Sequence, residues 1–79
     1  MAKKKKDEDE FIQRLAGRFK SLREQRGYTN YERFANAKDL PRAQVGRYEK
    51  GQDIRFSSLV KMTKALDISL KEFFSEGFD

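Results

Sequence analysis

The stretch that decides the fold is residues 30–51, which read NYERFANAKDLPRAQVGRYEKG. The pattern predicts a short helix, a tight turn and a second short helix over about residues 42–50. The first helix opens at Asn30 or Thr29, because both residue types accept hydrogen bonds from the first turn of a helix. It should end before Pro41, since proline disfavours helical geometry in the residue that precedes it. Pro41 also suits the entry to the second helix, where its missing N–H costs nothing.

The second helix has two faces of different character. At about 100° per residue, Val45 points to the core, with Tyr48 and Glu49 on the same side. The opposite face and its flanks hold five residues: Ala43, Gln44, Gly46, Arg47 and Lys50. Arg42 sits in the first turn, and its long side chain can swing off the helix end toward the same side.

A helix pair of this length and spacing fits a helix-turn-helix unit, in which the second helix enters the major groove of DNA.

The presence of Gly46 on the outer face of that helix requires an explanation, because a glycine inside a helix costs about 1 kcal/mol of stability relative to alanine. Close approach to a DNA backbone or to a partner is one reason. An indifferent surface position is the alternative.

Glu49 is unusual because it is a carboxylate on the core side of its helix. Buried acids are rare without a partner. We interpret it as half of an ion pair with an arginine of the first helix of the chain, for which Arg23 is the candidate. The alternative is a solvated carboxylate at the edge of the core.

The positive charge of the chain is unevenly distributed. Residues 11–26 contain five arginines and lysines against one acid, and residues 27–55 contain six against four acids. Residues 56–79 contain three against four acids. Positive charge therefore gathers in the part that holds the helix pair, as expected for contact with phosphates. A solvated basic face is the alternative, and charge alone does not separate the two.

Four segments of the chain together resemble the Cro/cI-type helix-turn-helix family of phage repressors and bacterial regulators. They are, in order, LREQRG (22–27), NYERFA (30–35), PRAQVGRYEKG (41–51) and LDISLKEFF (66–74). The resemblance covers residues 15–74 and implies an all-α fold, a compact five-helix lambda-repressor-like DNA-binding domain. The chain departs from the family pattern at the turn, where Lys38-Asp39 replaces the usual glycine and Pro41 replaces a serine or threonine cap.

The resemblance also implies roles for single residues. The exposed start and middle of the second motif helix would contact base edges, through Arg42, Ala43, Gln44 and Arg47. The first motif helix and the fourth helix would contact the DNA backbone at their starts, through Asn30, Tyr31 and Arg55. The family pairs an arginine of its first helix with a glutamate of its third, which matches Arg23 and Glu49.

The residue pattern adds further candidates for phosphate binding. Lys50 lies on the outer face of the second motif helix. Ser57 and Ser58 lie in the first turn of the next predicted helix, whose N–H groups would bind a phosphate. Ordinary helix capping explains the two serines equally well. The arginines of the first helix would also hold the domain on phosphates.

Helices on either side of the motif should supply the rest of the core. A helix over about residues 10–26 carries Phe11, Leu15, Phe19 and Leu22 at spacings of four, four and three, and we interpret this stripe as core. A helix over about residues 56–66 has a broad apolar face that begins at Phe56.

A last helix begins at Ser69 with a capping-box pattern. Three phenylalanines follow within six residues: Phe73, Phe74 and Phe78. They exceed what one short helix normally buries in a small domain. Contacts between two copies of the chain and packing inside one core are both open interpretations.

Length and composition predict one small domain over residues 11–79, preceded by a disordered charged tail over residues 1–10. The chain has no cysteine and no histidine, which removes disulfides, thiolate metal sites and the commonest catalytic base. We therefore expect no enzyme activity, no cofactor, no metal and no small-molecule ligand. No apolar run is long enough to span a membrane, and the lysine-rich start lacks the apolar stretch of a signal peptide. These features favour a cytoplasmic setting.

The sequence thus predicts a protein that binds double-stranded DNA sequence-specifically, as a prokaryotic transcriptional regulator that contacts the major groove with the helix around Arg42–Lys50. If the protein forms a homodimer, its two half-sites should lie about one helical turn apart, near 34 Å. The alternative is a protein-interaction module of the same fold, for example an antitoxin-like protein that binds a partner. The basic outer face argues against this alternative, and the phenylalanine-rich end argues for it. RNA binding is weaker, because the tyrosines do not line one stacking surface.

Overall fold

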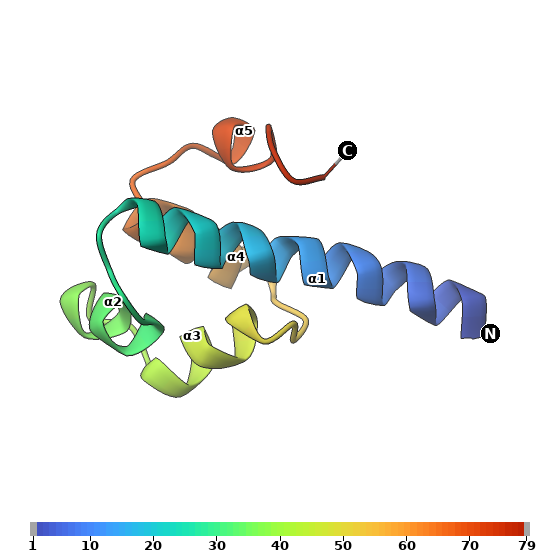
Figure 1. The fold of residues 1–79 in the computed structure, drawn as a ribbon, viewed down its shortest axis with the longest axis horizontal. Helices are drawn as coiled ribbons and strands as arrows, with labels where there is room; N and C mark the ends of the chain where they lie inside the picture. Colours follow the sequence, from blue (N-terminus) through green and yellow to red (C-terminus); the bar gives the residue numbers. More distant parts are fainter. Residues whose placement is uncertain (1, 79) are drawn as a thin grey trace.

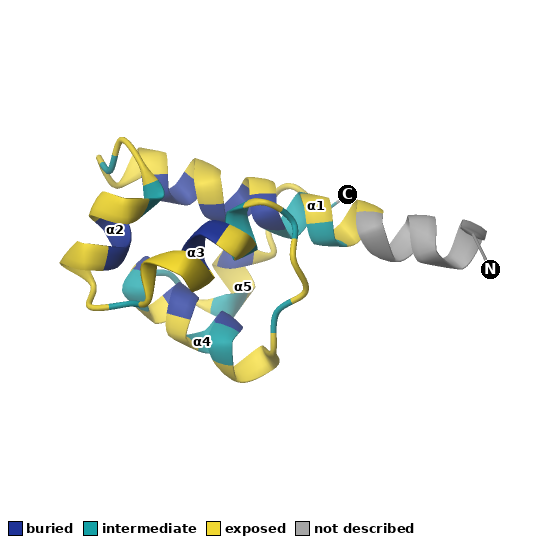
Figure 2. Ribbon diagram, turned by 90° about the horizontal axis from the view of Figure 1, so that it is seen from below, coloured by how far each residue is buried: buried dark blue, intermediate teal, exposed yellow. Residues whose placement is uncertain are grey.

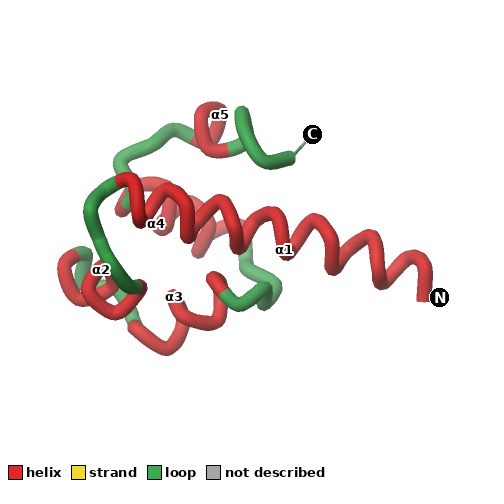
Figure 3. Tube along the Cα trace, in the orientation of Figure 1, coloured by secondary structure: helices red, strands yellow, loops and turns green. Residues whose placement is uncertain are grey.

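A computed structural model describes the backbone of residues 2–78 and the side chains of residues 10–78. In this part of the chain there are five α-helices and no strand, which confirms the all-α prediction (Figures 1 and 3). The helices are α1 (Ala2–Gln25), α2 (Tyr31–Ala37), α3 (Arg42–Glu49), α4 (Phe56–Ala65) and α5 (Leu70–Phe73).

The first helix begins earlier than the sequence predicted. Its bounds start at Ala2 rather than near Glu10, so the helical backbone runs into the segment that was expected to be a disordered tail. The side chains of residues 1–9 lie outside the described residues, and the division into a tail and a domain stays a prediction.

In the view of Figure 1, the long helix α1 lies between the motif helices and α5, and α4 lies behind it. The motif helices α2 and α3 pack on each other and on one side of α1, and α5 lies on the other side (Figure 1). Because α1 is the support for both motif helices, residues on its inner side determine where α3 stands.

Helices α1 to α4 end in the same way. The residue after each C-cap has a positive φ, and the N–H of the following residue donates to a carbonyl five positions earlier. Glycine takes the left-handed position after α1 and α3, at Gly27 (φ 92°) and Gly51 (φ 95°). Aspartate takes it after α2 and α4, at Asp39 (φ 57°) and Asp67 (φ 56°). The unusual Lys38-Asp39 turn therefore has the geometry that a glycine would provide, because aspartate tolerates this conformation better than most residues.

A small core lies between the helices. Its fully buried side chains come from all five elements and include Phe19, Phe34, Val45, Leu66 and Phe73. Figure 2 shows buried segments on the helices that enclose this core.

Two phenylalanines that were predicted to lie in the core are exposed. Phe11 of α1 is 56% exposed and Phe56 of α4 is 66% exposed. Both line an apolar groove formed by the middle of α1, the loop before α4, the first turns of α4 and the chain after α5. The correction has a simple reason, because α5 is only four residues long and nothing in the described chain covers this groove.

The three C-terminal phenylalanines differ in burial. Phe73 has no exposed surface, and its ring centroid lies 5.1 Å from that of Phe19. It is therefore a core residue, which is one of the two interpretations that the sequence left open for these phenylalanines. Phe74 is 44% exposed and Phe78 is half-buried, with ring centroids 4.9 Å apart in the same apolar groove.

Candidate nucleic-acid interface

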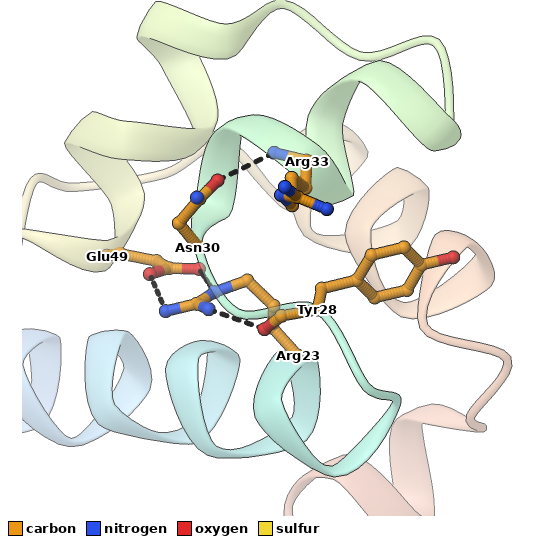
Figure 4. A network of polar contacts seen from close by, with 5 residues as sticks. All are labelled: Arg23, Tyr28, Asn30, Arg33 and Glu49. Carbon is orange, nitrogen blue, oxygen red and sulfur yellow. Dashed lines mark hydrogen bonds and ion pairs between the residues drawn. The ribbon is translucent and has the colours of Figure 1, made fainter.

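The start of α2 is held by Asn30. Its Oδ1 accepts a hydrogen bond of 2.9 Å from the backbone N–H of Arg33, so Asn30 rather than Thr29 is the N-cap (Figure 4). The side chain of Asn30 is exposed while it makes this bond. The cap satisfies one of the N–H groups at the start of α2 that have no partner within the helix.

Tyr31, the next residue, lies over α3. A Cβ placed on Gly46 would stand 2.7 Å from Cε1 and 2.8 Å from Cζ of the Tyr31 ring. Gly46 is buried, so it does not belong to the outer face of α3 as the sequence suggested. The reason for this glycine is a neighbouring ring of the same chain, rather than DNA or a partner.

Glu49 at the end of α3 pairs with Arg23 of α1. The Nε and Nη2 atoms of Arg23 donate to the two carboxylate oxygens at 2.8 and 3.0 Å, and its Nη1 donates to the carbonyl of Tyr28 at 2.8 Å. Figure 4 shows the guanidinium between these two acceptors. The side chains are 5% and 7% exposed, so water competes little with the bond. The pair ties the C-terminal end of α3 to α1.

Four residues of α3 form the surface that was predicted to contact bases. Arg42, Ala43, Gln44 and Arg47 are all exposed, whereas Val45 and Gly46 between them are buried (Figure 2). Arg42 approaches Glu32 of α2 only to 4.0 Å, and both side chains are more than half exposed. A pair of this kind is weak and leaves the guanidinium able to move to another acceptor.

The residues predicted to bind phosphates fall into two clefts, one on each side of this surface. The first, which we call the α2 cleft, is lined by Asn30, Tyr31 and Lys50 and also by Lys20 of α1. The second, the α4 cleft, is lined by Arg55 and Ser57 together with Gln44, Arg47, Ser58 and Lys61. The exposed residues of α3 therefore stand next to two clefts, each of which also has acidic residues in its lining, Glu24 and Glu49 in the α2 cleft and Asp53 in the α4 cleft.

Lys20 and Lys61 are candidates that the sequence analysis missed. Lys61 lies four residues after Ser57 on α4, a spacing that puts both on one helix face, so periodicity was a usable signal for it. Lys20 had no such signal, because only the packing of α1 against the motif brings it to the α2 cleft.

Two expectations about this surface need correction. The arginines of the first helix were expected as a group to reach phosphates, but Arg18 is buried, as is Arg23, the predicted partner of Glu49. Arg18 instead donates to the backbone carbonyls of Glu72 and Phe73 at 2.8 and 2.7 Å, which holds the end of α5. Ser57 is not a helix cap either, since the N-cap of α4 is Arg55 and no side chain accepts a cap hydrogen bond there.

Two short helices joined by a tight turn, with the second exposed on the side away from α1, define a helix-turn-helix protein. The model of a helix-turn-helix family matches residues 19–73, which is most of the chain. The chain belongs to this Cro/cI-type helix-turn-helix family of DNA-binding regulators. No curated protein and no solved structure matches the chain.

No helix within the described residues has the length and apolar character needed to cross a membrane. The same residues contain no cluster of three or more acidic, histidine or cysteine side chains placed to hold a metal ion.

Proposed function

We propose that the protein binds double-stranded DNA sequence-specifically and acts as a transcriptional regulator of prokaryotic type. The observation that carries this proposal is the exposed surface of α3 between the α2 cleft and the α4 cleft. Binding would take place in the cytoplasm, without catalysis and without a cofactor or small-molecule ligand.

In this proposal the two clefts would contact the DNA backbone, and α3 would contact the bases. Backbone contacts position a protein on the duplex, and base-edge contacts carry the sequence information. The α2 cleft would bind phosphates of one DNA strand through Asn30, Tyr31 and Lys50. The α4 cleft would bind phosphates of the other strand through Arg55 and Ser57. Arg42, Gln44 and Arg47 would then meet base edges, and Ala43 would contact a thymine methyl group.

Selection of bound sequences from a random duplex pool tests this function. We expect a defined site, because α3 presents both arginine and glutamine to the groove, and a roughly palindromic one if two copies bind with two-fold symmetry. Binding that is equally strong to all sequences and falls steeply with salt would contradict the proposal, since it would reduce the protein to phosphate contact.

We further propose that a second copy of the chain occupies the apolar groove. Exposed large hydrophobic side chains in the described chain all lie in it: Phe11, Phe56 and Phe74. Contiguous exposed apolar surface of this kind marks an interaction site. Two observations favour a copy of the same chain as the occupant.

The first observation is charge. Asp53 lines the groove, and Arg55, two residues further on, lines the adjoining α4 cleft, so in a two-fold arrangement the carboxylate of each copy would have a cation of the other copy nearby. The second is position. Ile54 and Phe56 alternate with Arg55 of the α4 cleft, so a copy held in the groove would adjoin the proposed DNA surface and present its own α3 to the same duplex.

Sedimentation equilibrium of the wild type and of Phe56→Glu tests self-association. We expect a dimer for the wild type and a monomer for Phe56→Glu, because a carboxylate in the groove would be desolvated by the second copy. Gln25→Glu is the matched control, since it adds the same charge at an exposed position of α1 away from the groove. A wild type that remains monomeric both free and on DNA would contradict the dimer.

The same groove supports the alternative function, a module that binds another protein. A duplex pool that yields no defined site, together with a wild type that remains monomeric, would support this alternative. Weaker binding of Phe56→Glu to the selected duplex would argue against this alternative, because that result would link the groove to DNA recognition.

A further inference from the structure

The Tyr31 ring of α2 lies directly over Gly46 of α3. The hypothetical Cβ on residue 46 would stand 2.7, 2.8 and 3.1 Å from Cε1, Cζ and the hydroxyl oxygen of Tyr31. Packed carbon atoms stay about 3.5–4.0 Å apart, so any side chain at residue 46 must displace the ring or the helix. The ring therefore fills the space between the two helices, and only glycine at residue 46 permits its present position.

Gly17 provides the contrast within the same molecule. It also lies inside a helix, and a Cβ there would meet nothing within 4 Å. Both glycines lower helix propensity by about 1 kcal/mol relative to alanine. At Gly17 nothing in the described structure requires this, whereas at Gly46 the packing of Tyr31 does.

The ring of Tyr31 also reaches the surface. Tyr31 is half-buried and lines the α2 cleft together with Asn30, Lys20 and Lys50. One side of the residue therefore belongs to the proposed phosphate contacts, and the other side rests on the helix that is proposed to contact bases.

We propose that the Tyr31 ring is a spacer that sets the distance between the phosphates bound in the α2 cleft and the recognition helix α3. Gly46 is then a specificity-determining position, although it contacts no DNA. This inference rests on the proposed function and adds to it a device that positions α3.

The physical reason lies in the different tolerance of the two kinds of contact. A bidentate hydrogen bond to a base requires heavy-atom distances of about 2.7–3.2 Å and good alignment, so a small displacement of α3 weakens it. Contacts of long cationic side chains with phosphates are electrostatic and adapt to such a displacement. Displacing the ring should therefore reduce sequence discrimination more than general DNA affinity.

The test compares Gly46→Ala with Gly17→Ala as the matched control. Dissociation constants are measured by fluorescence anisotropy for the selected duplex and for a scrambled duplex at one salt concentration. We expect Gly46→Ala to lower the ratio of the two affinities about tenfold, the size of one bidentate base contact. Its affinity for the scrambled duplex should stay close to that of the wild type. Gly17→Ala should keep the wild-type ratio.

Two substitutions of Tyr31 keep the test decisive if Gly46→Ala does not fold, as judged by circular dichroism. Tyr31→Phe retains the spacer and should keep the wild-type ratio, with any loss of affinity equal for both duplexes. Tyr31→Leu removes the ring and should lower the ratio. In the double variant Tyr31→Leu/Gly46→Ala, the added methyl group should occupy part of the vacated space and recover part of the ratio.

The outcomes separate this inference from the proposed function. If the wild type does not distinguish the two duplexes, the proposed function is wrong and the spacer role falls with it. If the wild type distinguishes them and Gly46→Ala has the same ratio, only the spacer is overturned. An equal loss of ratio in Tyr31→Phe and Tyr31→Leu would also overturn it, because the hydroxyl rather than the ring would then be the cause.

Discussion

The core beside the motif and the apolar groove along the middle of α1 show two different outcomes of the same sequence pattern. Both were predicted from apolar residues at helical spacing. Beside the motif, Phe19 and Leu22 of α1 are buried in the core, where the ring of Phe19 lies near those of Tyr48 in α3 and Phe73 in α5. In the groove, Phe11 and Phe56 are on comparable stripes and remain more than half exposed. Periodicity therefore identifies the apolar face of a helix, but it does not say whether another element covers that face.

Polar residues differ between the two regions as well. The motif contains a buried ion pair, a capping asparagine and a close ring-to-glycine contact, and each one constrains where α3 stands. The groove has Asp53 as the charged residue in its lining and no comparable constraint among the described residues. The contacts within the chain fix the position of the motif helices. The apolar groove lacks such contacts and is suited to binding another surface.

Alanine substitutions of two phenylalanines should give the largest difference between the regions. Phe19→Ala should lower the free energy of unfolding by about 3–5 kcal/mol, because a fully buried ring leaves a cavity. Phe56→Ala should change it by less than about 0.5 kcal/mol at concentrations where the protein is monomeric. Urea denaturation measures both, and equal losses would mean that Phe56 is covered within one chain.

The buried ion pair should give the next largest effect. Glu49→Ala leaves the guanidinium of Arg23 buried without its carboxylate, which costs about 3–5 kcal/mol in comparable cases. Glu32→Ala is the control, since its pair with Arg42 spans 4.0 Å at an exposed position and should contribute less than about 1 kcal/mol. If the two variants unfold at the same urea concentration, the pair does not hold α3 to α1.

Two cations beside the motif should affect DNA binding in different ways. Arg47→Ala should cost about 1–3 kcal/mol of discrimination at one base pair per half-site, because arginine can hold guanine in a bidentate manner. Lys61→Ala should weaken binding to all sequences alike and reduce the salt slope by about 1. Binding titrations over single-base variants and several salt concentrations measure both. A uniform loss for Arg47→Ala would make it a phosphate contact.

The smallest effect concerns the turn of the motif. Asp39→Gly should raise the stability by about 0.5–1 kcal/mol, because glycine adopts a positive φ without steric cost. This corresponds to an increase in Tm of a few degrees for a domain of this size. Gly51→Ala is the reverse test at the end of α3, and it should lower the Tm because its φ is 95°. A lower Tm for Asp39→Gly would show that the aspartate side chain stabilises the turn.

Local rules were enough to predict most of the motif. The cap at Asn30, the stop before Pro41 and the glycine after α3 depend only on hydrogen bonds and backbone geometry within a few residues. The pairing of Arg23 with Glu49 was accessible because a carboxylate on an apolar face demands a partner. The predicted start of α1 near Glu10 was wrong, since the helix begins at Ala2, whereas the charged tail over residues 1–10 stays a prediction.

Several features of the candidate site depended on contacts between distant segments. The role of Gly46 is set by a ring from α2, and the two clefts collect side chains from different helices, including Lys20 and Lys61. The sequence also did not show which arginines of α1 are exposed. Arg18 is turned toward α5, where it donates hydrogen bonds to two backbone carbonyls.

The sequence by itself determined the helices of the motif, the exposed set on α3 and the need of Glu49 for a cation, because these follow from periodicity, capping and the cost of burying a charge. Only the tertiary structure decided which apolar stripes are covered, which cations reach the surface and why residue 46 is glycine. All three features depend on distances between side chains of different helices, and the spacing of residues along one helix gives no information about those distances.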